Sequence, residues 1–189
     1  MRLILASNSP RRRELLQNAG FDFEVRPSGI EEIRLPDESP EDFARRLARD
    51  KALEVARQSE AGSLVLGADT VVTVNAEIME KPVDAADAAR MLRTLSGRAH
   101  RVITAVCLVR APESILAWKH ETTSVTFGNL TCEEIETYVA SGEPFDKAGG
   151  YAIQGLASRF VPRIDGCYFN VVGLPVPLLH EIMKSVTAE

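Results

Sequence analysis

The sequence has little of what marks disulfide-stapled, zinc-binding or membrane-spanning proteins. Its 189 residues include three cysteines, Cys107, Cys132 and Cys167, with no CxxC pair and no Cys/His metal spacing. Neither a disulfide framework nor a zinc site is expected. No apolar run reaches membrane-spanning length, and the short apolar start is followed by arginines instead of a signal-peptide cleavage site. These absences predict a cytoplasmic protein.

The chain also lacks an excess of basic residues. Lys and Arg number 22 against 27 Asp and Glu, a net charge of -5, whereas binders of nucleic acid or anionic membranes carry a basic excess. Aromatic residues are 6% of the chain and form no stacking stripe, and the three histidines share no metal spacing. We therefore expect no nucleic-acid partner and no membrane partner.

Strand and helix patterns alternate along the whole chain. Helices are predicted at 9–20, 39–60, 84–97, 131–144 and 174–186, from apolar periodicity and end signals. Strands are predicted at 2–7, 21–29, 63–74, 100–110 and 114–127 (the last as one strand or a pair), with a turn at 75–77 before a short returning strand and another short strand in "FVPRIDG". This alternation favours one α/β domain over residues 1–189 with a mixed sheet.

The segment "SNSPRRRELL" places cations where a helix begins. Ser9 is a natural N-cap and Pro10 suits the first helical position, yet Arg11, Arg12 and Arg13 fill the first turn. Cations there oppose the helix dipole, at a cost of about 0.3–1 kcal/mol each at exposed sites. A bound anion reverses that penalty, because helix N-termini and arginines both bind phosphate. The alternative is an exposed basic turn paired with nearby carboxylates.

Two further positions break an apolar pattern. Lys51 lies on the apolar stripe of helix 39–60, which fits either an ammonium reaching the solvent or a cation aimed at an internal cleft. Taken alone, the pattern favours the first. Asp69 and Thr70 follow the apolar run "LVLGA", and ligands bind beyond the carboxyl ends of strands in open α/β sheets. Asp69 is therefore a candidate metal ligand or base, or else a turn aspartate.

The remaining candidates are single polar residues in predicted loops. Glu32 follows Glu31 in an acidic loop and could supply a second carboxylate to a metal–phosphate substrate. Lys81 precedes a proline, which holds its backbone extended. Gln154 shares a glycine-rich loop with Lys147, and its amide can pair with the edge of a base.

Eight ordered motifs resemble those of the Maf family of nucleoside triphosphate pyrophosphatases. They span nearly the whole chain: "LASNSPRRRELL", "IEE", "RLARDKA", "GADTVV", "EKP", "LSGRAHRVITAV", "DKAGGYAIQG" and "NVVGLP". The sequence looks most like the dTTP/UTP pyrophosphatase branch. The resemblance implies hydrolysis between the α- and β-phosphates, including those of modified pyrimidine nucleotides, and a divalent cation, Mg²⁺ or Mn²⁺. It also implies a homodimer, a house-cleaning role linked to division arrest, and an elongated, twisted mixed sheet flanked by helices with a cleft, similar to inosine triphosphate pyrophosphatases.

The resemblance also implies roles for single residues. Asp69 matches the proton acceptor, and Glu32 with Asp69 would hold the metal, so that base and ligand roles are not separable from the sequence. The other polar residues expected around the phosphates and metal are Ser7, Arg12, Lys51 and Lys81. The positions linked to base choice are Arg12, Thr70 and Gln154.

Two other functions fit the same sequence. The chain could be a nucleotide-sensing regulator of septum formation that binds without turnover. It could also bind nucleic acid through Arg11–Arg13, against which the acidic net charge speaks.

Overall fold

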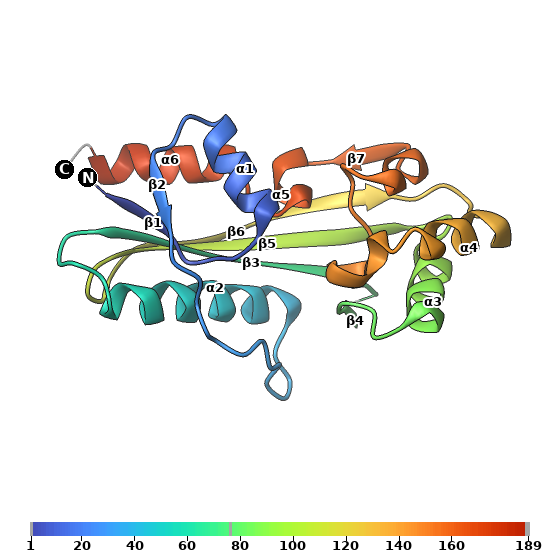
Figure 1. The fold of residues 1–189 in the computed structure, drawn as a ribbon, viewed down its shortest axis with the longest axis horizontal. Coiled ribbons are helices and arrows are strands. Elements are labelled where there is room, and N and C mark those ends of the chain that lie inside the picture. Colours follow the sequence, from blue (N-terminus) through green and yellow to red (C-terminus); the bar gives the residue numbers. More distant parts are fainter. Residues whose placement is uncertain (1, 76, 188–189) are drawn as a thin grey trace. The chain divides into compact units, whose positions relative to one another are not determined.

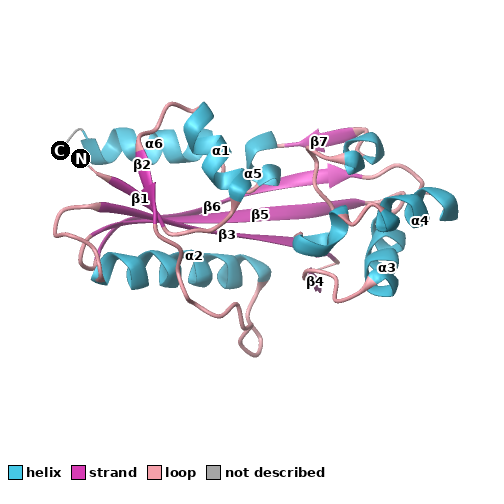
Figure 2. Ribbon diagram, viewed as in Figure 1, coloured by secondary structure: helices cyan, strands magenta, loops and turns pink. Residues whose placement is uncertain are grey.

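The computed structural model of the chain describes residues 2–75 and 77–187 (Figure 1). Strands and helices alternate as expected, and the fold is mixed α/β (Figure 2). In chain order, the elements are β1 (Leu3–Leu5), α1 (Pro10–Asn18), β2 (Phe23–Val25), α2 (Pro40–Arg57), β3 (Leu64–Val74), β4 (Glu77–Met79), α3 (Ala85–Leu95), β5 (Ala99–Arg110), β6 (Ser114–Thr126), α4 (Cys132–Ala140), the 3₁₀ helices η1 (Glu143–Asp146), η2 (Ala148–Gly150) and η3 (Leu156–Phe160), β7 (Arg163–Asp165), α5 (Tyr168–Val172) and α6 (Val176–Thr187).

Side-chain caps fix where four of the predicted helices begin. Ser9 accepts a hydrogen bond from the third residue beyond it at α1, and Ser39 does the same at α2, each followed by a proline in the first turn. Asp84 accepts in the same way from the Asp87 amide at α3. At α4, Thr131 and Glu134 form the complete capping box. These starts are local features, so the sequence predicts them well.

The seven strands form one sheet that contains both parallel and antiparallel pairs. The order is β2-β1-β3-β5-β6-β7, and β4 pairs with β3 off this path. Strand β1 is parallel to both β2 and β3, whereas β4 is antiparallel to β3 and β7 is antiparallel to β6. The predicted mixed sheet is therefore confirmed.

The described chain divides into two compact units. The first contains Met1–Thr70, Thr104–Glu121 and Gly173–Glu189, and the second contains Val71–Ile103 and Thr122–Val172. Strands β3, β5 and β6 supply residues to both. That residues 1–189 act as a single domain with a cleft stays a prediction.

In the first unit, helix α2 lies directly on strand β3. A Cβ atom on Gly67 of β3 would stand 2.1 Å from the Ala48 carbonyl oxygen and 2.8 Å from the Ala52 Cβ of α2. Such close approach needs a glycine and two small residues. Within this unit, α2 lies on one side of the strands and α1 and α6 lie on the other (Figure 1).

In the second unit, aromatic rings fill the core between the strands and helices α3 and α4. The Phe127 ring makes edge contacts with His100 and Tyr151, and the rings of Tyr138 and Phe160 meet in the same way. These rings pack with apolar side chains of β3, α3 and β5, including Val72, Leu92 and Val102. Their burial, together with that of the aliphatic side chains, stabilises this unit.

The structure corrects several details of the predicted elements. Of the two alternatives for residues 114–127, the single strand is confirmed, and the glycine-rich segment predicted as a loop contains η2 and the end of η1. The pattern also missed helix α5, a single short turn between two glycines. One residue of the predicted turn at 75–77, Ala76, lies outside the described residues. Across the part of the chain that the structure describes, no helix has the length and apolarity to span a bilayer.

The buried His100 gives a testable pH dependence. Its Nε2 atom lies 2.7 Å from the Tyr151 hydroxyl, its Nδ1 atom is buried without a partner, and burial lowers the pKa of His100 to about 4. Between that value and the ordinary 6.5, the unfolded chain binds a proton that the folded chain does not. The contribution to stability is therefore complete above pH 6.5 and is lost as the pH falls toward 4, by about 1.4 kcal/mol per pH unit.

The measurement is urea unfolding of the wild type and His100→Gln at several pH values between 4 and 7. The variant should lose this part of the pH dependence, since its side chain does not titrate. Equal slopes in the two proteins would contradict the assignment.

Candidate functional site

A buried lysine joins two of the predicted site carboxylates in the first unit. The Lys51 ammonium of α2 donates to Glu32 Oε1 at 2.5 Å and to Asp69 Oδ1 at 2.6 Å. Lys51 and Asp69 are 7% and 5% exposed, whereas Glu32 lies at the surface. The expectation that the sequence pattern alone favoured, an ammonium in solvent, is wrong, because the ammonium is held inside by two opposite charges.

The contact between α2 and β3 sets this pairing. Gly67 and Asp69 are two residues apart on β3, so their substituents lie on the same face of the sheet. Ala48 and Ala52, which flank Lys51 in sequence, lie against Gly67. Lys51 is therefore brought to Asp69 by close packing of small residues.

Asp69 lies within β3 and does not follow its end. The strand continues through Val74, because Val71 and Val72 extend the β-favouring run. The expectation of a carboxylate just beyond a strand end is therefore wrong in detail, although the carboxylate does lie in a polar cluster.

Burial and charge act in opposite directions on the Asp69 carboxyl group. Burial raises the pKa of Asp69 above its ordinary value, and the cations Lys51 and Arg12 oppose that rise. A carboxylate with a raised pKa is a stronger base than one in water. This is the direction that general-base chemistry near neutral pH needs.

Arg12 is the one arginine of the 11–13 cluster that turns into the protein. It is 9% exposed, and Arg13 is exposed at the surface. Its guanidinium donates to the Gly173 and Ala68 carbonyl oxygens, both at 2.9 Å, to the Ser7 hydroxyl at 3.0 Å and to the Thr70 hydroxyl at 3.1 Å. Four of the five N–H donors of the group are thus used by the protein itself.

Burial has an electrostatic cost at Arg12. It lowers the pKa of the guanidinium, while the negative charges of Asp69 and Glu32 act to raise it. The four hydrogen bonds and these two charges keep a buried cation in place. Arg12 thereby links three segments to one another: the turn before α1, strand β3 and the segment that precedes α6.

Thr70 is held in the same network. Its hydroxyl oxygen lies 2.9 Å from the Thr104 hydroxyl and 3.4 Å from the Gly173 carbonyl oxygen. Sequence analysis did not single out Thr104 or Gly173. The available sequence signal was a threonine inside the apolar run of β5, whereas the φ of +125° at Gly173 is visible only in the structure.

Lys81 and Gln154, the two other predicted site residues, lie in the second unit. Both are exposed. Within this unit the segments that carry them meet, since the Gly149 amide donates to the Glu80 carbonyl oxygen at 3.1 Å. The structure thus gathers Ser7, Arg12, Glu32, Lys51, Asp69 and Thr70 in the first unit and Lys81 and Gln154 in the second.

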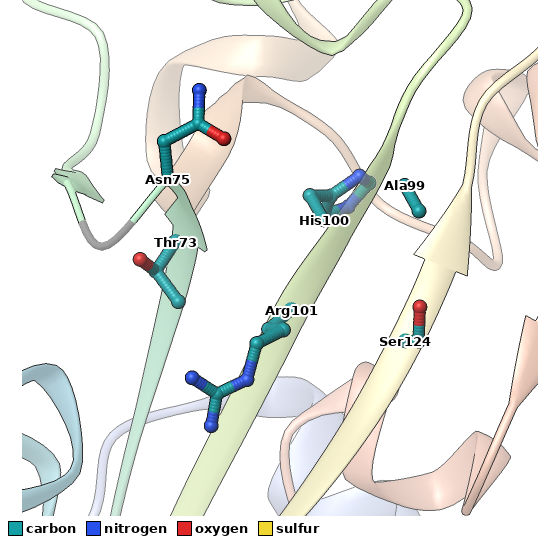
Figure 3. A pocket seen from close by; sticks show the side chains of 6 residues that line it. All are labelled: Thr73, Asn75, Ala99, His100, Arg101 and Ser124. Atoms are coloured by element: carbon teal, nitrogen blue, oxygen red, sulfur yellow. The ribbon is translucent and has the colours of Figure 1, made fainter.

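A small hollow in the second unit contains none of the predicted site residues (Figure 3). Its volume is about 160 Å³, and it lies over the strands, lined by Thr73, Asn75, Ala99, His100, Arg101 and Ser124. We assign no part of the candidate site to it.

Glu32 and Asp69 supply the donor type that a hard divalent cation prefers. Their oxygens converge on one ammonium, so the two carboxylates face a common position. No group of three or more His, Cys, Asp or Glu side chains able to hold a metal occurs among the described residues. Mg²⁺ in phosphate-processing proteins is commonly bound by one or two carboxylates, water and substrate phosphates, so these residues fit such an ion when the phosphates are present.

Comparison with known proteins relates this geometry to a family. The model of the family described as "Maf-like protein" matches residues 2–186. A "dTTP/UTP pyrophosphatase" of Geobacter sulfurreducens is 52% identical over 187 residues, which cover 99% of this chain and 97% of the relative. Proteins with the same name from Koribacter versatilis and Escherichia coli O157:H7 are each 50% identical, over 97% and 98% of this chain and 94% and 93% of theirs.

Solved structures align only in part. A HAM1 protein from Coxiella burnetii has a TM-score of 0.48 at 15% identity, over 67% of this chain and 73% of that one. A nucleoside-triphosphatase, or dITP/XTP pyrophosphatase, from Mycobacterium abscessus has a TM-score of 0.43 at 20% identity, over 69% and 76%. Similarity at this level is too weak to bear on the site. The family match over residues 2–186 and the relatives at half identity are decisive: the chain belongs to the Maf family.

Proposed function

We propose that this protein is a nucleoside triphosphate pyrophosphatase that converts dTTP and UTP to the monophosphate and pyrophosphate. The observation that carries the proposal is the buried Lys51 ammonium between Glu32 and Asp69. It occurs in a chain half identical to proteins named dTTP/UTP pyrophosphatase. A buried, basic carboxylate beside a cation and a second carboxylate suits attack of water on a phosphate.

Asp69 acts in this proposal as the proton acceptor for the attacking water. Its raised pKa makes it a better base than a solvated aspartate. Glu32 shares the Lys51 ammonium with it, so both carboxylates stay oriented toward one point before substrate arrives. That orientation removes part of the entropic cost of assembling the site.

Glu32 and Asp69 also hold a divalent cation, Mg²⁺ or Mn²⁺, together with the substrate phosphates. When bound, the ion supplies positive charge to the phosphate oxygens and acidity to a nearby water molecule. Lys51 and Lys81 supply further positive charge for the pyrophosphate that leaves. The Gln154 amide and the backbone of its loop pair with the polar edge of uracil or thymine.

We propose that Arg12 contributes to substrate use mainly through the residues that it holds. Its guanidinium already donates to Ser7, Ala68, Thr70 and Gly173. Ala68 and Thr70 are the neighbours of Asp69 in β3, so Arg12 fixes the strand on both sides of the base. This adds a positioning role to the two that the family resemblance implies for Arg12, near the phosphates and in the choice of base.

The reaction assignment is tested with purified protein, Mg²⁺ and a panel of UTP, dTTP, CTP, ATP and GTP. We expect pyrophosphate and monophosphate as products, with UTP and dTTP the preferred substrates. Release of orthophosphate would refute the reaction type. Tight nucleotide binding without turnover would favour the non-catalytic regulator.

The role of Asp69 is tested with Asp69→Asn, which keeps the shape and removes the basic group. The kcat should fall by about 10²–10⁴-fold, the usual contribution of a general base, while nucleotide still binds. Asp22→Asn, a change of the same kind at an exposed aspartate, is the matched control and should keep wild-type kcat. Full activity of Asp69→Asn would exclude the proton-acceptor role.

The role of Arg12 is tested by comparing Arg12→Ala with Arg11→Ala and Arg13→Ala. Arg12→Ala removes the guanidinium from four acceptors and should lower the free energy of unfolding by about 2–4 kcal/mol. Arg11→Ala, at a half-buried arginine, should lower it less than Arg12→Ala does. Arg13→Ala, at an exposed arginine of the same cluster, should change it by less than about 0.5 kcal/mol, as surface substitutions usually do. All three are measured by urea unfolding at pH 7.

Arg12→Lys is the second variant for the same question. A lysine keeps the charge but cannot reach four acceptors in the fork geometry, so kcat/KM for UTP should stay far below wild type in a folded protein. Equal kcat/KM in Arg12→Lys and wild type would show that charge alone suffices and would contradict the positioning role.

A further inference from the structure

The loop that carries Gln154 presents its amide on a tightly folded turn. The Gly155 amide donates to the Ala152 carbonyl oxygen at 3.1 Å, and the Ser158 amide donates to the Gly155 carbonyl oxygen at 3.0 Å. Gln154 is exposed, and within the described residues its side chain makes no hydrogen bond. Its donor and acceptor groups therefore remain available to a ligand.

The carboxylate of Glu143 is hydrogen bonded to this turn. Its Oε2 atom accepts from the Leu156 amide at 2.9 Å, and its Oε1 atom accepts from the Tyr138 hydroxyl at 2.9 Å. Tyr138 is fully buried in the aromatic core of the second unit. Glu143 thus links the residue two positions after Gln154 to a side chain of the buried core.

Gly155 shows how closely the turn and the carboxylate pack. A Cβ atom at this position would lie 2.3 Å from Glu143 Oε1, so any larger residue here would displace the carboxylate from its present position. The φ of Gly155 is -95°, a value open to any residue, so the glycine serves here to make space and not to allow a special backbone conformation. Gly155, the residue after Gln154, therefore leaves the space that the Glu143 carboxylate occupies.

The backbone of Glu143 is fixed as well. Its amide donates to the Ser141 hydroxyl oxygen at 3.2 Å, and its carbonyl oxygen accepts from the Lys147 ammonium at 2.6 Å. The backbone N–H and C=O groups of Glu143 are thus both hydrogen bonded to nearby residues of the same segment. A carboxylate held in this way is a rigid support for the turn.

We infer that Glu143 is a positioning residue for base selection, because it fixes the turn that presents Gln154 to the pyrimidine. The inference rests on the proposed function. A turn that is ordered before binding avoids the cost of ordering it in the complex, and it holds the amide and backbone donors in one arrangement. Glu143 itself touches neither the nucleotide nor the reacting atoms in this role.

The first test is steady-state kinetics of Glu143→Ala with UTP and CTP, with Glu136→Ala on the exposed face of α4 as the matched control. In Glu143→Ala, kcat/KM for UTP should fall about tenfold, mostly through KM, and the UTP-to-CTP selectivity should fall with it. The kcat at saturating UTP should change less than about threefold. Glu136→Ala should match wild type in all three quantities.

The second test is a double-mutant cycle with Gly155→Ala. Alone, this substitution should lower UTP selectivity as Glu143→Ala does, because the new methyl group displaces the carboxylate. In the Glu143→Ala background it should have little further effect, since the clash is gone. Tyr138→Phe, which removes one of the two hydrogen bonds and keeps the ring, should give an intermediate loss and replaces Glu143→Ala if that variant does not fold.

The results separate this inference from the proposed function. Reduced thermal stability of Glu143→Ala with unchanged UTP-to-CTP selectivity would overturn the inference and leave the function intact. Additive effects of Glu143→Ala and Gly155→Ala would overturn it too. Absence of pyrophosphate release by the wild type would instead refute the function.

Discussion

The site depends on one buried ammonium. Taking Lys51 and Asp69 out of water is costly, and the contacts of the Lys51 ammonium at 2.5 Å to Glu32 and 2.6 Å to Asp69 offset much of that cost. Removing Lys51 takes away the ion-pair partner of the buried Asp69, whereas removing Glu32 leaves the pair of Lys51 and Asp69 in place. The packing of α2 on β3 holds the members of that pair together.

Arg12 is a second buried cation, and its role in the first unit differs from that of Lys51. Lys51 neutralises carboxylates, whereas Arg12 mainly satisfies carbonyl and hydroxyl oxygens of three separate segments. The cost of placing Arg12 at the positive end of the α1 dipole is thus offset in part without any ligand, because its buried guanidinium donates to backbone carbonyl oxygens. The charge that remains at the surface is that of its neighbours.

Local signals explain which features could be predicted. The caps at Ser9, Ser39 and Thr131 and the interleaving of strands and helices follow from short-range chemistry. The polarity of the Lys51 and Asp69 positions was visible, but their pairing was not, because it depends on a long-range contact between Ala48 and Gly67. Family resemblance selected Arg12 from its neighbours, and the structure shows why their side chains differ. Sequence analysis did not single out Glu143, because its hydrogen bond to the turn at Leu156 joins residues 13 apart in the chain.

The close contact between α2 and β3 limits which substitutions the active protein can accept. Ala48, Ala52 and Gly67 carry no polar side-chain atoms and touch no reacting group, yet they set the spacing on which the ion pairs depend. A methyl group added at Gly67 lifts the helix and with it Lys51, so a change in volume is converted into a change in charge balance. The activity therefore depends also on positions that touch no reacting group and need only a small residue.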